Sequence, residues 1–194
     1  MDRIRHPIVI SIMTVGFNPV NFYIVMEHFK SSDLRKILRS TRKDVKYQLS
    51  DEHKIYILSQ LCKAISFLHQ LSVPIIHKDL KPEKILVNEE GDTKICDLGL
   101  SKCDDLPSAL HTTVGRNRKI IYSYMAPEIL VHNEPTTTKS DVWSLACIIH
   151  KVYTGEETWE AHLRTTKGSF STISDKLKKI FELKKKPDLS EVPQ

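Results

Sequence analysis

Long apolar runs are missing from this chain of 194 residues, and no stretch approaches the roughly 18 apolar residues of a membrane-spanning helix. The opening stretch MDRIRHPIVISIMTVGF has basic residues before an apolar run, as a secretion signal does. However, Asp2 lies in its basic part, Ser11 and Thr14 interrupt its apolar part, and no small-residue cleavage site follows. We therefore interpret it as a buried strand and predict no membrane partner.

Cysteine is also scarce. Its four positions, Cys62, Cys96, Cys103 and Cys147, form no C-x-x-C pair, and three of them lie in apolar surroundings. This pattern is typical of reduced, buried thiols rather than of a disulfide framework. We therefore expect an intracellular protein, cytoplasmic or nuclear.

Neither sign of charge dominates strongly, because 29 Lys and Arg residues against 24 Asp and Glu residues give a formal net charge of +5. Much of the excess lies in KLKKI and ELKKKP near the end of the chain. No aromatic residues alternate with these lysines, so a solvated helix face is favoured over a nucleic-acid-binding patch. We predict no nucleic-acid partner and, from the length and the 40% hydrophobic content, one globular domain.

What the sequence does contain is a mixture of strand and helix patterns, which predicts an α+β fold. Residues 8–13 and 21–29 are β-rich and flank a turn signal at Gly16 to Pro19. KILV (84–87) and TKIC (93–96) are β-rich as well, and the polar, Gly-containing loop between them predicts an antiparallel hairpin.

Three longer helices are expected. The first is capped by Ser50 and stopped by Val73-Pro74, the second begins at Ser140 and ends at Gly155, and the third begins at Asp175. The second is apolar around its circumference, which indicates a central helix. The residues predicted to be buried are Ile55, Leu58, Leu61, Cys62, Ile65 and Leu68 in the first helix, Val142, Trp143, Leu145, Ala146, Ile148, Ile149 and Val152 in the second, and Leu177, Ile180 and Phe181 in the third.

The stretch from Ile75 to Gly99 is the most informative one. Asp79 precedes the predicted hairpin and Asp97 follows it, 18 residues later. Because antiparallel strands bring the two ends of a hairpin together, the two carboxylates can face one site. With Lys81 nearby, that arrangement suits metal-assisted phosphoryl transfer.

At these residues the chain resembles a known family. HKDLKPEKILV followed by DLG is similar to the catalytic and metal-binding loops of the eukaryotic protein kinases, YMAPE (124–128) resembles their A-P-E element, and SDVWS (140–144) resembles the start of their long helix. The resemblance implies the α+β protein kinase-like fold, mainly the helical C-terminal lobe plus the last strands of the N-terminal lobe. It further implies a kinase domain of the serine/threonine type, with ATP and Mg²⁺ as cofactors and a protein substrate or partner.

The family pattern also assigns segments of the chain. Residues 1–29 would be the end of the small lobe and the hinge, and residues 30–194 the helical large lobe. Within the large lobe, the resemblance places the catalytic loop at 75–88, the metal loop at 97–99 and the activation segment at 97–128.

Individual roles follow from the same resemblance. Asp79 would accept or orient the substrate hydroxyl, Lys81 would neutralise the transferring phosphate, and Asp97 would hold Mg²⁺. The nucleotide-binding residues would be Met26, Glu27, His28, Phe29, Asp33 and Leu86, the supporting residues His77, Glu128, Asp141 and Trp143, and the candidate activation-loop phosphorylation sites Thr112 and Thr113. Asp33 fits a carboxylate at the start of the helix LRKILR equally well.

The chain departs from the family pattern at several places. Lys84 stands where the family has a metal-binding asparagine, and at about 4 Å an ammonium would repel Mg²⁺ by roughly 8 kcal/mol at an effective dielectric near 20. We expect Lys84 either to contact a phosphate or to point into solvent. Lys78 replaces an arginine that receives a phosphate, Ile120 and Ile121 stand in place of Gly-Thr, and Leu98 replaces phenylalanine.

Other parts of the family pattern have no counterpart in the sequence. These are the Gly-rich loop, the strand lysine that contacts the nucleotide phosphates and its glutamate partner, and an arginine expected to pair with Glu128. We therefore expect a partial kinase domain, with a catalytically impaired binding or scaffold module as the alternative.

Overall fold

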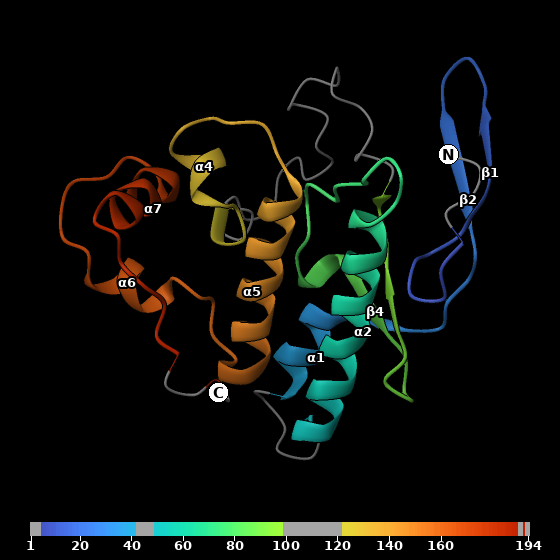
Figure 1. Cartoon of the computed structure of the whole chain (residues 1–194), viewed down its shortest axis with the longest axis horizontal. Helices are drawn as coiled ribbons and strands as arrows, with labels where there is room; N and C mark the ends of the chain where they lie inside the picture. The colour runs from blue at the N-terminus through green and yellow to red at the C-terminus, as the bar shows by residue number, and fades with distance from the viewer. Residues whose placement is uncertain (1–4, 42–48, 99–121, 190–191, 193–194) are drawn as a thin grey trace. The chain divides into compact units, whose positions relative to one another are not determined.

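Residues 5–41, 49–98, 122–189 and 192 are described by the computed structural model (Figure 1). The chain forms two units, one comprising Met1–Leu68 with Pro82–Leu98 and the other His69–Lys81 with Gly99–Gln194. Helices and strands both occur, which confirms the predicted α+β class.

The first unit begins with a hairpin of two antiparallel strands, β1 (Ile12–Phe17) and β2 (Phe22–Met26). Its turn lies at residues 18–21 rather than 16–19, because the Asn18 side chain accepts the backbone N–H groups of Val20 and Asn21 at 3.0 and 2.7 Å. The paired strands are therefore confirmed, with a later turn.

The opening strand was also predicted to be buried, and that prediction is wrong for most of β1. Met13, Val15 and Phe17 are exposed, whereas the buried apolar residues are Ile8, Val9 and Ile10, just before the strand. This segment lies beside Ile95. Val9 forms a parallel bridge with Ile95, and the Ile10 N–H donates to the Ile95 carbonyl at 2.9 Å.

A small antiparallel sheet in the same unit has the strand order β3-β4-β5. Its strands are β3 (Ser32–Asp33), β4 (Ile85–Val87) and β5 (Thr93–Ile95), and a short 3₁₀ helix, η2 (Pro82–Lys84), leads into β4. Ile85 pairs with Ile95 and Val87 with Thr93, so the predicted hairpin is confirmed. Helix α1 (Leu34–Thr41) directly follows β3.

Helix α2 (Asp51–His69) begins as predicted, because the Ser50 hydroxyl accepts the N–H of His53 at 3.3 Å. Its buried face was predicted only in part. Ile55 and Cys62 are exposed, and that part of the prediction is wrong. The residues buried along α2 are Ile57, Leu58, Gln60, Leu61, Ala64, Ile65 and Leu68.

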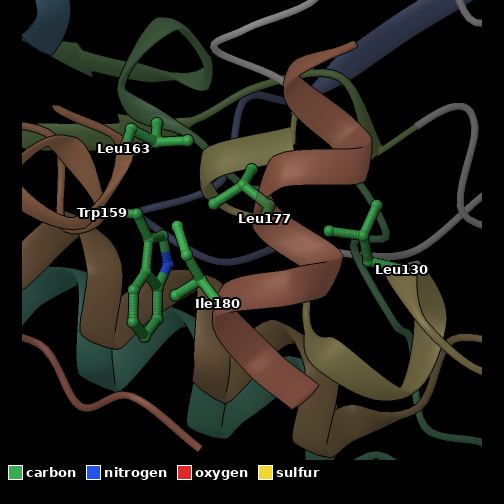
Figure 2. Packing of buried hydrophobic residues seen from close by; sticks show 5 residues of the cluster. All are labelled: Leu130, Trp159, Leu163, Leu177 and Ile180. Carbon is green, nitrogen blue, oxygen red and sulfur yellow. The ribbon is translucent and has the colours of Figure 1, made fainter. Parts of the chain in front are cut away.

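The second unit contains α4 (Pro127–Leu130), α5 (Thr138–Thr154), α6 (Glu160–Thr165) and α7 (Ile173–Glu182). Figure 2 shows α7 facing α4 and α6 through a buried apolar cluster. Aromatic rings extend this cluster, since Trp143 stacks on Trp159 at 5.8 Å and the edge of Phe181 meets Trp159 at 4.9 Å. The buried members are Leu130, Trp159, Leu163, Leu177 and Ile180.

Two helix starts lie two residues earlier than predicted. Ser140 and Asp175 are the third residues of their helices, and they complete capping boxes that begin at the N-cap residues Thr137 and Thr172. The end of α5 is confirmed at Gly155, which takes the left-handed conformation with φ of 71°. The predicted circumferential burial of α5 is wrong at Val142 and Ala146, which are exposed.

Candidate functional site

The second unit carries Asp79 and Lys81 in its first segment, His69–Lys81. The Lys81 ammonium lies 2.8 Å from each carboxylate oxygen of Asp79, and the Lys81 residue is only 4% exposed. An ammonium that bridges both oxygens neutralises the carboxylate and fixes its plane. The spacing D-L-K therefore places an acid and a base in direct contact on one short loop.

The backbone before this pair is held by Asp141, in the first turn of α5. Its carboxylate accepts the N–H groups of His77 at 2.7 Å and Lys78 at 3.1 Å, and it contacts His69 Nε2 at 2.9 Å. Asp141 is 2% exposed, so these charge-assisted bonds satisfy a carboxylate that would otherwise be costly to bury.

Lys78 and His77 complete the loop. Lys78 has φ of 68°, a left-handed conformation that is strained for a residue with a long side chain, and the Asp141 bonds to its own N–H and to that of His77 hold it there. His77 is fully buried, and its Nδ1 lies 3.4 Å from the Asp79 N–H. The loop carrying Asp79 is thus fixed by its backbone.

The first unit carries the metal-loop residue Asp97, two residues after β5. Asp97 also has a positive φ, of 66°. Its Oδ2 atom pairs with the ammonium of Lys84. The prediction that Lys84 points into solvent is wrong, because its side chain is only 17% exposed and pairs with Asp97. The alternative, a contact with a phosphate, stays a prediction.

This arrangement does not fit a magnesium ion. Mg²⁺ requires hard oxygen ligands in near-octahedral geometry, and the carboxylate expected to supply one is paired with an ammonium. Among the described residues, no group of three or more His, Cys, Asp and Glu side chains could hold a metal ion. The cation next to the Asp97 carboxylate is the Lys84 ammonium.

The segment expected to contact adenine follows β2. The N–H of Glu27 donates to the Ser11 carbonyl at 3.0 Å, and its Oε1 atom accepts from the Ser11 N–H at 2.8 Å and from Lys94 at 2.9 Å. Burial alone would raise the pKa of Glu27, but the bonds from Lys94 and Ser11 outweigh it and lower this pKa. Lys94 also lies 5.7 Å above the Phe29 ring. Met26 and His28 are exposed.

Asp33 and Leu86 are backbone partners in the pairing of β3 with β4. One Asp33 oxygen accepts the N–H of Lys36 at 2.9 Å and the other pairs with the Lys36 ammonium at 3.0 Å. Asp33 therefore acts as a carboxylate at the start of α1, and its contact with a ribose stays a prediction, as does the Leu86 contact with adenine.

The arginine that pairs with Glu128 in the family pattern has no counterpart in the sequence. Within the described residues, Arg164 pairs with Glu160 at 3.4 Å. Trp143, the other supporting residue outside the loop, is half-buried against the aromatic cluster. Thr112, Thr113, Ile120 and Ile121 lie outside the described residues.

The sequence interpretation missed some polar residues that position the site. Gln60, buried on α2, donates to the Gly91 carbonyl and accepts the Thr93 N–H, each at 3.0 Å, and so holds the hairpin that precedes Asp97. Glu157 accepts from Tyr124 at 2.8 Å and from Lys151 at 2.7 Å beside the A-P-E segment. A polar residue on an otherwise apolar helix face was the available signal for Gln60.

Comparison with known proteins decides the family, because a protein kinase domain model matches residues 1–194. The chain belongs to the protein kinase family. Members of this family bind ATP, generally with Mg²⁺, and protein substrates. In the described part of this kinase chain, no helix is both long and apolar enough to cross a membrane.

The curated relatives of the chain include a serine/threonine-protein kinase and mitogen-activated protein kinases. It is 30% identical over 159 residues to serine/threonine-protein kinase CTR1 of Arabidopsis thaliana, covering 82% of the chain and 18% of the relative. It is 32% identical over 159 residues to mitogen-activated protein kinase KSS1 of Saccharomyces cerevisiae, covering 78% of the chain and 42% of that kinase. The chain thus spans less than half the length of either relative.

Proposed function

We propose that this chain provides the acceptor side of a serine/threonine protein kinase site, where the γ-phosphate of ATP is transferred to a protein hydroxyl. The observation that carries the proposal is the contact between the half-buried Asp79 and the buried Lys81 on a loop fixed by Asp141. A carboxylate held in this way can receive a hydrogen bond from an acceptor hydroxyl without rearranging, which is what positioning catalysis requires.

In the proposed reaction, Asp79 orients the serine or threonine hydroxyl and accepts its proton. The hydroxyl oxygen forms a bond to the γ-phosphorus while the bond from that phosphorus to the β–γ bridging oxygen breaks, and ADP leaves with the electron pair. Lys81, already in contact with both Asp79 oxygens, neutralises charge on the transferring group. Met26, Glu27, His28, Phe29, Asp33 and Leu86 are proposed to bind the nucleotide.

The test is phosphate transfer by the full chain. The chain is incubated with ATP labelled in its γ-phosphate and a mixed peptide library, and mass spectrometry identifies the modified residues. We expect phosphoserine and phosphothreonine, and a loss of at least about 100-fold in the Asp79→Asn variant, the low end of what one proton-transferring group contributes. Asp51→Asn, an exposed carboxylate on α2, should leave the rate unchanged. Equal rates for wild type and Asp79→Asn would refute the proposed role.

A second function has specific support in the pairing of Lys84 with Asp97. This contact, together with Lys78 in place of the family's arginine, supports a binding module without transfer activity. For such a module we expect no transfer in the assay above and no rise in melting temperature on adding Mg·ATP. A clear rise that disappears in Asp97→Asn rules this module out.

A further inference from the structure

The pairing of Lys84 with Asp97 is built into the backbone of the β4–β5 hairpin. Lys84 is the residue before β4, and Cys96 is the residue after β5. The Cys96 N–H donates to the Lys84 carbonyl at 3.0 Å, which extends the ladder one step beyond the pairing of Ile85 with Ile95. Asp97 follows at the next position, so strand register brings the two side chains to the same end of the hairpin.

The two partners differ in their access to solvent. The Lys84 side chain is 17% exposed, whereas the Asp97 side chain is 44% exposed. The ammonium is therefore the more enclosed partner, while the carboxylate stays within reach of dissolved ions. A dissolved cation must compete with a cation that the chain itself holds against the carboxylate, and an attached ligand has the advantage of a high effective concentration.

We propose that Lys84 is the resident cation of the Asp97 loop and takes the place that a divalent metal would otherwise occupy. The β4–β5 register places the ammonium at the carboxylate, and Mg²⁺ gives up its water ligands reluctantly for a single, already paired carboxylate. Removal of the Lys84 charge should therefore open the Asp97 carboxylate to a divalent cation. This inference shares with the proposed function only the residue Asp97, and it holds whether or not the chain transfers phosphate.

The experiment measures Mn²⁺ binding to the full chain without nucleotide, by the electron paramagnetic resonance signal of free Mn²⁺. For wild type we expect the same affinity as for Asp97→Asn, within twofold. Lys84→Met, which keeps the length of the side chain and removes its charge, should bind Mn²⁺ at least tenfold more tightly. That gain should disappear in the double variant Lys84→Met/Asp97→Asn.

Lys94→Met is the matched control, because it removes the same charge from the same hairpin but from the ion pair with Glu27. Any affinity that it gains should not depend on Asp97. A wild-type chain that loses Mn²⁺ affinity on Asp97→Asn overturns the inference, and so does a folded Lys84→Met variant that binds no more tightly than wild type. If Lys84→Met fails to fold, the Mn²⁺ affinities of wild type and Asp97→Asn still test the inference. No ATP or acceptor is present, so failure of phosphate transfer cannot be mistaken for either result.

Discussion

At the scale of single residues, the chain buries the charge of Lys81 beside the carboxylate of Asp79. Removing only the acid leaves a buried ammonium without its counter-charge, whereas replacing both groups removes the need for one. We expect Asp79→Asn to lower the free energy of unfolding by about 2–4 kcal/mol. The double variant Asp79→Asn/Lys81→Met should recover at least half of that loss, as measured by urea denaturation. Losses that simply add would show that the two charges do not depend on each other.

Burial also raises the pKa values of the cysteine thiols, and by different amounts. Burial, with the negative charge of Asp97, raises the pKa of Cys96 to about 11, and burial raises that of Cys147 to about 12. Only about 1 in 10,000 Cys96 side chains is then a thiolate at pH 7, and the thiolate is the reactive form. Cys62 is exposed, and burial raises its pKa less.

We therefore expect iodoacetamide at pH 7.5 to label Cys62 at least tenfold faster than Cys96 or Cys147, followed by peptide mass spectrometry. The rate at Cys96 should rise as the pH approaches 11. In guanidinium chloride the three rates should converge, and rates that are already equal in the folded chain would contradict the expected protection.

At the scale of elements, the β4–β5 hairpin depends on the conformation of its turn. Gly91 has φ of 85°, and a Cβ atom there would lie 3.3 Å from the Tyr56 ring. We expect Gly91→Ala to lower the free energy of unfolding by about 1–2 kcal/mol, the cost of a left-handed conformation for a residue with a Cβ. Gly16→Ala in β1 is the matched control, since its Cβ would meet nothing within 4 Å, and it should stay within about 0.5 kcal/mol of wild type. Thermal and urea unfolding of both variants measure the difference, and equal losses would contradict it.

The elements themselves were largely predictable because their signals are local. Ser50, Gly155 and the Gly-containing loop between the two β-rich runs each act within a few residues, and each lies where the sequence indicates. Burial was less predictable. Asp141 is buried because its partners are backbone N–H groups 64 and 63 positions earlier, and no pattern within α5 reveals them. Likewise, periodicity alone could not decide that Ile55 faces solvent.

At the scale of the whole molecule, four motifs in order sufficed for the family, which the match over residues 1–194 confirms. They did not suffice for the chemistry of Asp97. The departure at Lys84 was visible in the sequence, but its partner depends on strand register at the base of a hairpin, where a shift by one residue would reverse the side-chain directions. The order of the motifs identifies the family, whereas the cation next to the Asp97 carboxylate depends on the contact that Lys84 makes.

For the whole chain, the β1–β2 hairpin is a surface of exposed apolar side chains. Phe17 and Val20, at the turn, are each 85% exposed. A two-stranded hairpin with uncovered apolar side chains and open strand edges favours association between copies. We expect sedimentation velocity to show concentration-dependent self-association that Phe17→Ser/Val20→Ser reduces. Ile55→Ser, which replaces an exposed apolar residue on α2 instead, should leave it unchanged. Equal association in all three chains would mean that another surface of the molecule controls it.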